Sequence, residues 1–229
     1  MNPRRPSRLS HRDHDVINTI NVLSQVTTSQ LLRLHFSEPT TSELSRGHRT
    51  RRTLARLTQA GHIRRLGRPI GYSQGGSEGY TYLPARSRTH VGDPHAVDIA
   101  ELYVRLVEAE RQGRLRLLRF TPEDRVLHGT VEADAFIRVE VNGQEYEWYL
   151  EIDRGTEFKP QLRNKMRAYT KAASNSAYYP RVLYVVTFAA WDQFDKRINL
   201  ISEIIAGARF PEQFQVCRLD DAINHLACG

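Results

Sequence analysis

Residues 131–155 read VEADAFIRVEVNGQEYEWYLEIDRG, and this stretch decides the fold of the second half of the chain. Asn142-Gly143 stands between two runs in which apolar and polar residues alternate. A type I′ turn needs positive φ at both central residues, so Asn-Gly between such runs is the strongest short-range signal for a hairpin. The two-residue loop sets Val141 opposite Gln144 and thereby fixes the register of both strands.

The register sorts the hairpin side chains onto two faces, because successive residues of a strand point to opposite sides. The apolar face is predicted to be core and comprises Ala133, Ala135, Ile137, Val139, Val141, Tyr146, Trp148, Leu150 and Ile152. The other face carries four acids at the end far from the turn. Asp134 is predicted to lie opposite Glu151, and Glu132 opposite Asp153.

The repulsion among four neighbouring carboxylates must be reduced in some way, because like charges on directly opposed residues destabilise a sheet. Full solvation is one way, and raised pKa values are another. A divalent cation is the third, and a set of oxygen ligands suits Mg²⁺ or Mn²⁺. The sequence leaves open a metal-site geometry and a solvated acidic face.

The composition indicates a globular protein, since 40% of the 229 residues are hydrophobic and 26% are charged. No apolar run approaches the length of a membrane span, and no signal-peptide pattern opens the chain. We therefore expect a cytoplasmic protein without a membrane partner. Cys217 and Cys228 lack the spacing of a metal site or a disulfide framework, and we expect two reduced thiols.

The charge is distributed unevenly along the chain. Residues 1–90 contain 15 Arg, no Lys and 5 Asp and Glu, a net charge of +10, whereas residues 91–229 carry −3. This asymmetry predicts two modules, of which the first binds a polyanion. The predicted boundaries are a disordered basic arm at 1–12, a DNA-binding domain at 13–90 and an α/β domain at 91–229.

The first module has the pattern of a winged helix-turn-helix. Three helices are predicted. The first spans 13–24, the second begins after an N-cap at Thr27 or Thr28, and the third spans 43–60. Two short β runs, at 62–66 and 79–83, flank a Gly-rich loop that resembles a wing. A third helix with one packed face and one Arg face suits the major groove of double-stranded DNA. The other interpretation is a solvated Arg face on a small helical domain.

Eight arginines of this module are predicted to contact DNA. Arg49, Arg52 and Arg56 share the outer face of the third helix, opposite Thr50, Leu54 and Leu57. The full set is Arg46, Arg49, Arg51, Arg52 and Arg56 on the helix and Arg64, Arg65 and Arg68 on the wing.

The second module is predicted to be a mixed-sheet α/β domain. Helices are expected at 96–112, 158–173 and 192–207, and strands at 115–120, 181–188 and 214–219, in addition to the hairpin. The strand at 181–188 is apolar on both faces and is expected to be central.

This order of elements and its acids resemble the restriction-endonuclease-like PD-(D/E)XK nuclease fold. In that family an Asp on one strand and an acid-x-Lys on the next bind the metal. Asp134 and Glu151 match these positions, whereas Asp153 stands where the family has Lys. The family's Lys can migrate, and Lys165 on the next helix is the candidate. The resemblance implies Mg²⁺ or Mn²⁺ on Asp134, Glu151 and Asp153, with Lys165 as a catalytic residue and Glu132 as an accessory acid.

Residues 13–220 resemble the replication-relaxation family of plasmids, phages and integrative elements. Four segments carry the resemblance: RRTLARLTQAGHIRRL at 51–66, YTYLPA at 80–85, LEIDRGTE at 150–157 and the K-x-x-x-Y spacing of Lys165 and Tyr169. The family name implies a role in replication or DNA relaxation on a mobile element.

Two functions are compatible with these observations. The first is a non-enzymatic DNA-binding protein, a homodimer that works with replication proteins of the mobile element and retains a nuclease-derived scaffold. The second is a metal-dependent DNA endonuclease or nickase that uses the acidic site. A relaxase has less support, because the nine His include no His-x-His pair. No Walker motif supports ATP hydrolysis.

Overall fold

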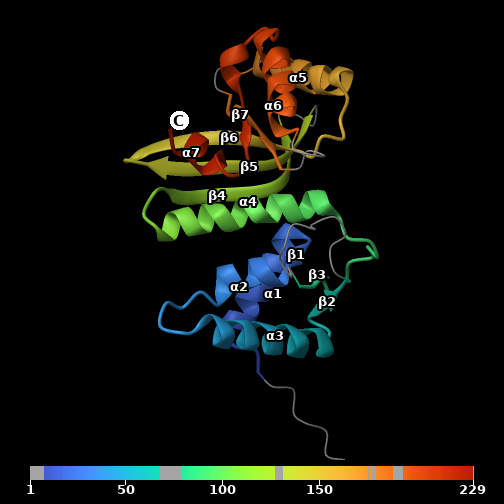
Figure 1. The fold of residues 1–229 in the computed structure, drawn as a ribbon, viewed down its shortest axis with the longest axis vertical. Helices are drawn as coiled ribbons and strands as arrows, with labels where there is room; N and C mark the ends of the chain where they lie inside the picture. The colour runs from blue at the N-terminus through green and yellow to red at the C-terminus, as the bar shows by residue number, and fades with distance from the viewer. Residues whose placement is uncertain are drawn as a thin grey trace, which may run out of the picture. The chain divides into compact units, whose positions relative to one another are not determined.

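The computed structural model describes residues 8–67, 79–126, 131–174, 176, 179–187 and 193–228, with the side chains of 124–126 left out. The chain divides into two compact units, Met1–Ala100 and Glu101–Gly229. The division falls inside helix α4 (Pro94–Arg111), rather than at the predicted boundary between residues 90 and 91. Figure 1 shows the elements of each unit.

The first unit consists of three helices and a small antiparallel sheet. Its elements before α4 are α1 (His11–Leu23), β1 (Val26–Thr27), α2 (Thr28–His35), α3 (Glu43–Gln59), β2 (Ile63–Arg65) and β3 (Thr81–Pro84). The strands pair in the order β1-β3-β2. The three predicted helices and the two predicted strands of this unit are confirmed, whereas β1 was not predicted.

Polar side chains fix where these helices begin. Ser10 caps α1 in a capping box with Asp13, and Thr27 caps α2 in a second capping box with Gln30. Helix α1 therefore includes residues 11 and 12 of the predicted arm, whose residues 1–7 lie outside the described residues. Thr28 does not cap α2; its hydroxyl bonds both the N–H of Tyr80 (3.0 Å) and the C=O of Tyr80 (3.1 Å).

The second unit is built on one mixed five-stranded sheet. After α4 come β4 (Arg116–Val126), β5 (Val131–Val141), β6 (Gln144–Asp153), α5 (Lys159–Ser174), β7 (Arg181–Val186), α6 (Phe194–Ala206), the 3-10 turn η2 (Pro211–Gln213), β8 (Phe214–Arg218) and α7 (Ala222–Cys228). The strand order is β4-β5-β6-β7-β8; the pairs from β4 to β6 are antiparallel and those from β6 to β8 parallel. The predicted mixed α and β architecture is confirmed, and β7 is an inner strand between β6 and β8, as expected from its apolar faces.

The hairpin forms as predicted. Asn142 and Gly143 have φ of +51° and +79°, and the register runs from Val141 opposite Gln144 to Ala135 opposite Leu150. The predicted core face is buried at Ala133, Ala135, Ile137, Val139, Trp148, Leu150 and Ile152, while Val141 and Tyr146 are half-buried. The ladder between β5 and β6 ends at that last pair, so the predicted pairs Asp134–Glu151 and Glu132–Asp153 are not part of it.

The opposite face of the sheet is also a core, which corrects the expectation of one buried face. Phe136 and Tyr149 pack there with Leu162, Met166 and Tyr169 of α5. Helix α5 therefore covers the end of β6 that carries Glu151 and Asp153, and both of these acids are buried.

Among the described residues no helix is long and apolar enough to cross a membrane. Cys217 and Cys228 are both free thiols, as predicted. Burial raises the pKa of the Cys217 thiol to about 12, which disfavours its reactive thiolate form.

Candidate functional site

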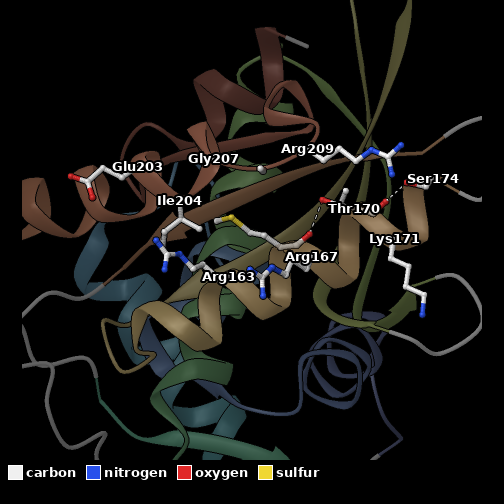
Figure 2. Close-up of a pocket in the computed structure, with 11 residues that line it drawn as sticks. Arg163, Arg167, Thr170, Lys171, Ser174, Glu203, Ile204, Gly207 and Arg209 are labelled. Atoms are coloured by element: carbon white, nitrogen blue, oxygen red, sulfur yellow. Dashed lines mark hydrogen bonds between the residues drawn. The ribbon is translucent and has the colours of Figure 1, made fainter.

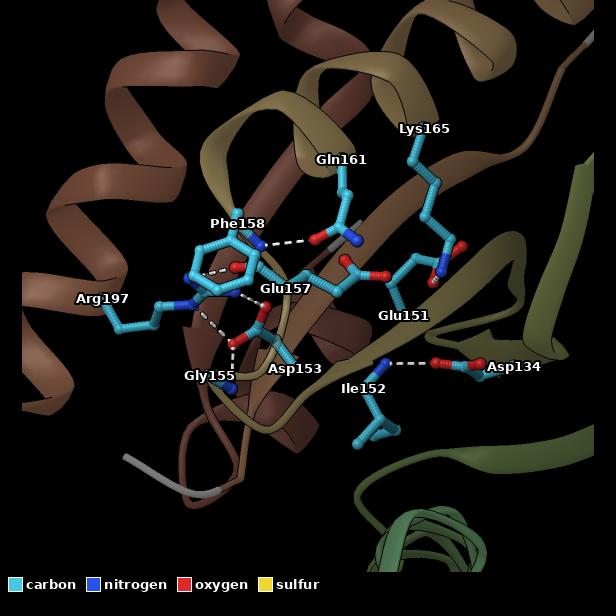
Figure 3. Close-up of polar contacts among 10 residues, drawn as sticks. All are labelled: Asp134, Glu151, Ile152, Asp153, Gly155, Glu157, Phe158, Gln161, Lys165 and Arg197. Carbon is cyan, nitrogen blue, oxygen red and sulfur yellow. Dashed lines mark hydrogen bonds and ion pairs between the residues drawn. The ribbon is translucent and has the colours of Figure 1, made fainter. Parts of the chain in front are cut away.

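The four hairpin acids do not form one cluster. Glu132 is exposed and lies opposite Arg125 of β4, whereas Asp134 is half-buried. Glu151 and Asp153 are only 2% and 5% exposed. The two buried acids have different partners, so the site separates into two polar groups at the end of β6 (Figure 3).

Asp134 closes the hairpin ladder with its side chain. Its Oδ2 accepts a hydrogen bond from the N–H of Ile152 at 2.6 Å. The regular pairing of β5 with β6 has ended at Ala135 and Leu150, so this carboxylate satisfies a strand N–H beyond the last ladder pair. A carboxylate that accepts from a backbone N–H has one oxygen already engaged.

Glu151 lies at the centre of the first group. The Lys165 ammonium reaches from α5 to form an ion pair with Glu151, and the Tyr169 hydroxyl donates to the same carboxylate. Figure 3 shows Lys165 extending toward Glu151 beside Asp134. The structure thus brings together three of the predicted site residues, Asp134, Glu151 and Lys165.

Burial controls the protonation of this group. Desolvation, together with the charge of Asp134, raises the pKa of Glu151 to about 8 against the opposing effects of Lys165 and Tyr169. Desolvation alone would lower the pKa of Lys165, but the charges of Glu151 and Asp134 raise it. One ammonium therefore faces two carboxylates, and the group becomes neutral when Glu151 holds a proton.

Tyrosine rings enclose the group on the α5 side of the sheet. The Tyr149 ring lies 6.1 Å from that of Tyr169 and 5.5 Å from that of Tyr179, between centroids. Burial and the Glu151 charge raise the pKa of Tyr169, so its hydroxyl stays protonated and donates. Glu151 itself is almost closed to water, which is the source of its desolvation.

Asp153 forms the second group with an arginine that the sequence did not reveal. Arg197 of α6 donates from Nε to Oδ1 (2.7 Å) and from Nη2 to Oδ2 (2.5 Å) of Asp153. The N–H of Gly155 also donates to Oδ1, at 2.8 Å. The two charged side chains are 3% and 11% exposed, so this is a buried bidentate ion pair.

The burial of Arg197 could have been predicted from its position in the helical repeat of α6. Ile201 and Ile204 follow it by four and seven residues, are buried, and mark the inner face of α6. An arginine on that stripe must find an acceptor inside the protein. Arg197 also donates to the C=O of Glu157 at 2.9 Å, which ties the segment after β6 to α6.

The acids as placed do not present a donor set for one divalent ion. Both oxygens of Asp153 accept from Arg197, Glu151 is held by Lys165 and Tyr169, and Asp134 accepts from Ile152. Within the part of the chain that the structure describes, no three His, Cys, Asp or Glu side chains are grouped to bind a metal. No catalytic step through a metal follows from this arrangement.

The predicted DNA-contacting arginines of α3 differ in their surroundings. Arg49, Arg51 and Arg52 are exposed, and Arg46 is half-buried. Arg52 points away from the buried Thr50, Leu54 and Leu57, because a helix turns by about 100° per residue. Arg49 donates to the Thr41 hydroxyl at 2.7 Å and lies 3.8 Å from Glu38.

Three of the other predicted arginines have structural contacts. Arg56 forms an ion pair with the buried Asp13 of α1. Arg64 donates to the carbonyl oxygens of Ser87 (2.7 Å) and Thr89. The Arg65 guanidinium lies 4.4 Å from the centroid of the Tyr80 ring, and Arg68 lies outside the described residues.

Arg56→Ala is expected to lower the free energy of unfolding by about 1–3 kcal/mol, because it removes a charged donor from a buried carboxylate. Burial alone would raise the pKa of Asp13, but hydrogen bonds from Ser10 and Arg56 lower it below its usual value. The stabilisation by Asp13 is therefore complete above its unfolded pKa and is lost as the pH falls through the folded pKa. Urea unfolding at neutral and acid pH measures both effects. Arg52→Ala is the matched control, and an equal loss there would contradict the role of Arg56.

Comparison with known proteins identifies one family. The model of the replication-relaxation family matches residues 83–183, a span that begins in β3 and includes the hairpin, α5 and part of β7. Neither the curated proteins nor the solved structures gave a match. Residues 83–183, which hold Asp134, Glu151, Asp153 and Lys165, thus match the family that the LEIDRGTE segment predicted.

Proposed function

We propose that this protein binds double-stranded DNA in the replication or DNA relaxation of a mobile element. The family match supports the replication-related role. In this proposal residues 13–90 are a winged helix-turn-helix that presents α3 to the major groove, and the second unit is a nuclease-derived scaffold.

The outward face of α3 is the observation that carries the proposal. Arg52 is exposed there and Arg51 is exposed on its flank, and neither has a hydrogen bond or ion pair with any residue that the structure describes. Helix α2 precedes α3, and the strands β2 and β3 follow it, which is the order that a helix-turn-helix with a wing requires. Free arginines on a helix packed by its other face suit guanine edges and phosphates.

Arg51→Ala with Arg52→Ala is expected to weaken duplex binding by about 10- to 100-fold and to reduce the salt slope by about two. Fluorescence anisotropy of a labelled duplex at several salt concentrations measures both. The matched control is Arg86→Ala with Arg88→Ala, which removes two exposed arginines of the same unit. Equal losses in the two variants would assign binding to net charge and overturn the assignment to α3.

The alternative is an Mg²⁺- or Mn²⁺-dependent DNA endonuclease or nickase. The meeting of Lys165 with Glu151 and Asp134 favours it, because these residue types match the nuclease pattern with a migrated Lys. The Asp153–Arg197 pair favours the scaffold, since an ion pair occupies the position that the pattern gives to a catalytic Lys. We therefore prefer the scaffold.

Incubation of supercoiled plasmid with the protein and Mg²⁺ or Mn²⁺ separates the two functions. The scaffold predicts intact plasmid at high protein excess. Cleavage that Asp134→Ala abolishes, and that Glu145→Ala at an exposed position of the same hairpin leaves unchanged, would establish the nuclease instead.

We further propose a homodimer that binds paired half-sites through two copies of α3, in partnership with replication proteins of the element. A two-fold symmetric protein matches a palindromic site with half-sites one helical turn apart. Sedimentation of the protein with and without such a duplex measures the oligomeric state.

A further inference from the structure

A second basic surface lies in the second unit, between α5 and α6. There the structure has a cavity of about 700 Å³. Figure 2 shows Arg163, Arg167 and Lys171 of α5 on one side, with Ile204 of α6 and Arg209 on the other.

The cations form a row along one edge of this groove. Arg163, Arg167 and Lys171 follow one another at intervals of four residues, so they share a face of α5 and step by about 6 Å along its axis. All three are exposed, and none has a hydrogen bond or ion pair with another described residue. Arg209 adds a fourth exposed cation from the other side.

Part of the groove lining is apolar. Met166 and Ile204 are buried and belong to this part, and Ala208 beyond α6 extends it. The acid of the lining, Glu203, accepts from Lys159 at 3.3 Å, so its charge is offset outside the groove. The groove therefore combines apolar side chains and the hydroxyls of Thr170 and Ser174 with a row of cations at its edge.

The charge of the groove is not a by-product of a basic domain. Residues 101–229 contain 18 Lys and Arg against 19 Asp and Glu, whereas the groove holds four cations and one acid. The groove is also separate from the group around Glu151. Lys165 contacts Glu151 and lies two residues from both Arg163 and Arg167. Two residues along a helix correspond to a rotation of about 200°, so Lys165 leaves α5 on the side away from these arginines.

We propose that this groove binds a single strand of nucleic acid. The sugar-phosphate backbone contacts Arg163, Arg167, Lys171 and Arg209, and an unstacked base packs on Met166 and Ile204. A concave channel admits a single strand, whereas the cylinder of a duplex would rest on its rim. Guanidinium groups suit phosphate because their donors form a planar fork. Apolar side chains tolerate any base, since every base has a π-face.

The inference goes beyond the duplex contact proposed for α3, and the two are separable in the full chain. The groove variant is Arg163→Ala with Arg167→Ala and Lys171→Ala. It is expected to weaken binding of a short oligothymidylate by about ten-fold or more and to lower its salt slope by about two. Its duplex affinity is expected to stay within about two-fold of the parent's.

Three further variants complete the design. The Arg51→Ala and Arg52→Ala pair is expected to show the reverse pattern, with duplex binding lost and oligothymidylate binding kept. A control of Arg116→Ala, Arg181→Ala and Lys196→Ala removes three exposed cations elsewhere in the second unit and is expected to change neither affinity. Arg163→Lys with Arg167→Lys keeps the charge and is expected to retain most of the single-strand binding.

Two results would overturn the inference. One is a failure of the groove variant to bind oligothymidylate more weakly than the control variant does. The other is displacement of oligothymidylate by polyglutamate at equal charge, which would assign the groove to an acidic protein segment. If the groove variant loses duplex binding and the Arg51→Ala and Arg52→Ala pair keeps it, the proposed role of α3 is refuted instead.

Discussion

Arg197→Met is expected to lower the free energy of unfolding by about 3–5 kcal/mol, the range for breaking a buried ion pair from one side. The substitution leaves the Asp153 carboxylate 3% exposed, without its two guanidinium hydrogen bonds. It also frees the carbonyl of Glu157, so the segment after β6 loses its tie to α6. Chemical unfolding followed by circular dichroism measures the change.

Two companion variants test the cause. Lys159→Met removes an ion pair with Glu203 that is exposed on both sides, and it is expected to cost about 1 kcal/mol or less. Asp153→Leu combined with Arg197→Met is expected to be more stable than either single variant, because no buried charge is left alone. A double variant that is weaker than both singles would contradict the electrostatic explanation.

The parent protein is expected to lose stability as the pH rises from about 5 to about 8, through Glu151. Its ordinary pKa of 4.5 is raised to about 8 in the folded state. Between these values the folded protein binds a proton that the unfolded chain does not, so each pH unit costs on the order of 1 kcal/mol while this holds. Unfolding by urea at a series of pH values measures the slope.

Glu151→Gln is the decisive comparison, because glutamine keeps the shape and has no proton to lose. The variant is expected to flatten the dependence over this range, so that its stability relative to the parent rises with pH. Lys165→Met is expected to extend the decline to higher pH, since it removes the cation that opposes the raised pKa of Glu151. An identical slope in the parent and Glu151→Gln would assign the pH dependence to other groups.

Local signals in the sequence were sufficient for the hairpin and the helices. Asn142-Gly143 sets the turn and the register, and Thr27 and Gln30 set the start of α2, through contacts within a few residues. Such contacts depend on backbone geometry that each residue type prefers, so the sequence reports them directly.

The partners of the buried charges could not be predicted in the same way. Lys165 was predicted to join Asp134 and Glu151, because a resemblance supplied the pattern. Arg197 meets Asp153 from 44 residues away, and only the packing of α6 on the sheet brings them together. Arg56 was assigned to the outer face of α3 from its spacing, but its long side chain turns toward Asp13. Helical spacing determines the face from which a side chain leaves the backbone, whereas tertiary packing determines which partner its charged group contacts.

The pairing of Asp153 with Arg197 also restricts how this protein can evolve. Asp153→Lys would recreate the acid-x-Lys order of the nucleases, yet it would place two cations together in a site that is almost closed to water. A single substitution at either position leaves a buried charge without its partner, so a change from Asp153 to Lys is expected to need a second change at Arg197. Among relatives, positions 153 and 197 should therefore vary as a pair, and a lysine at the first should accompany an uncharged residue at the second.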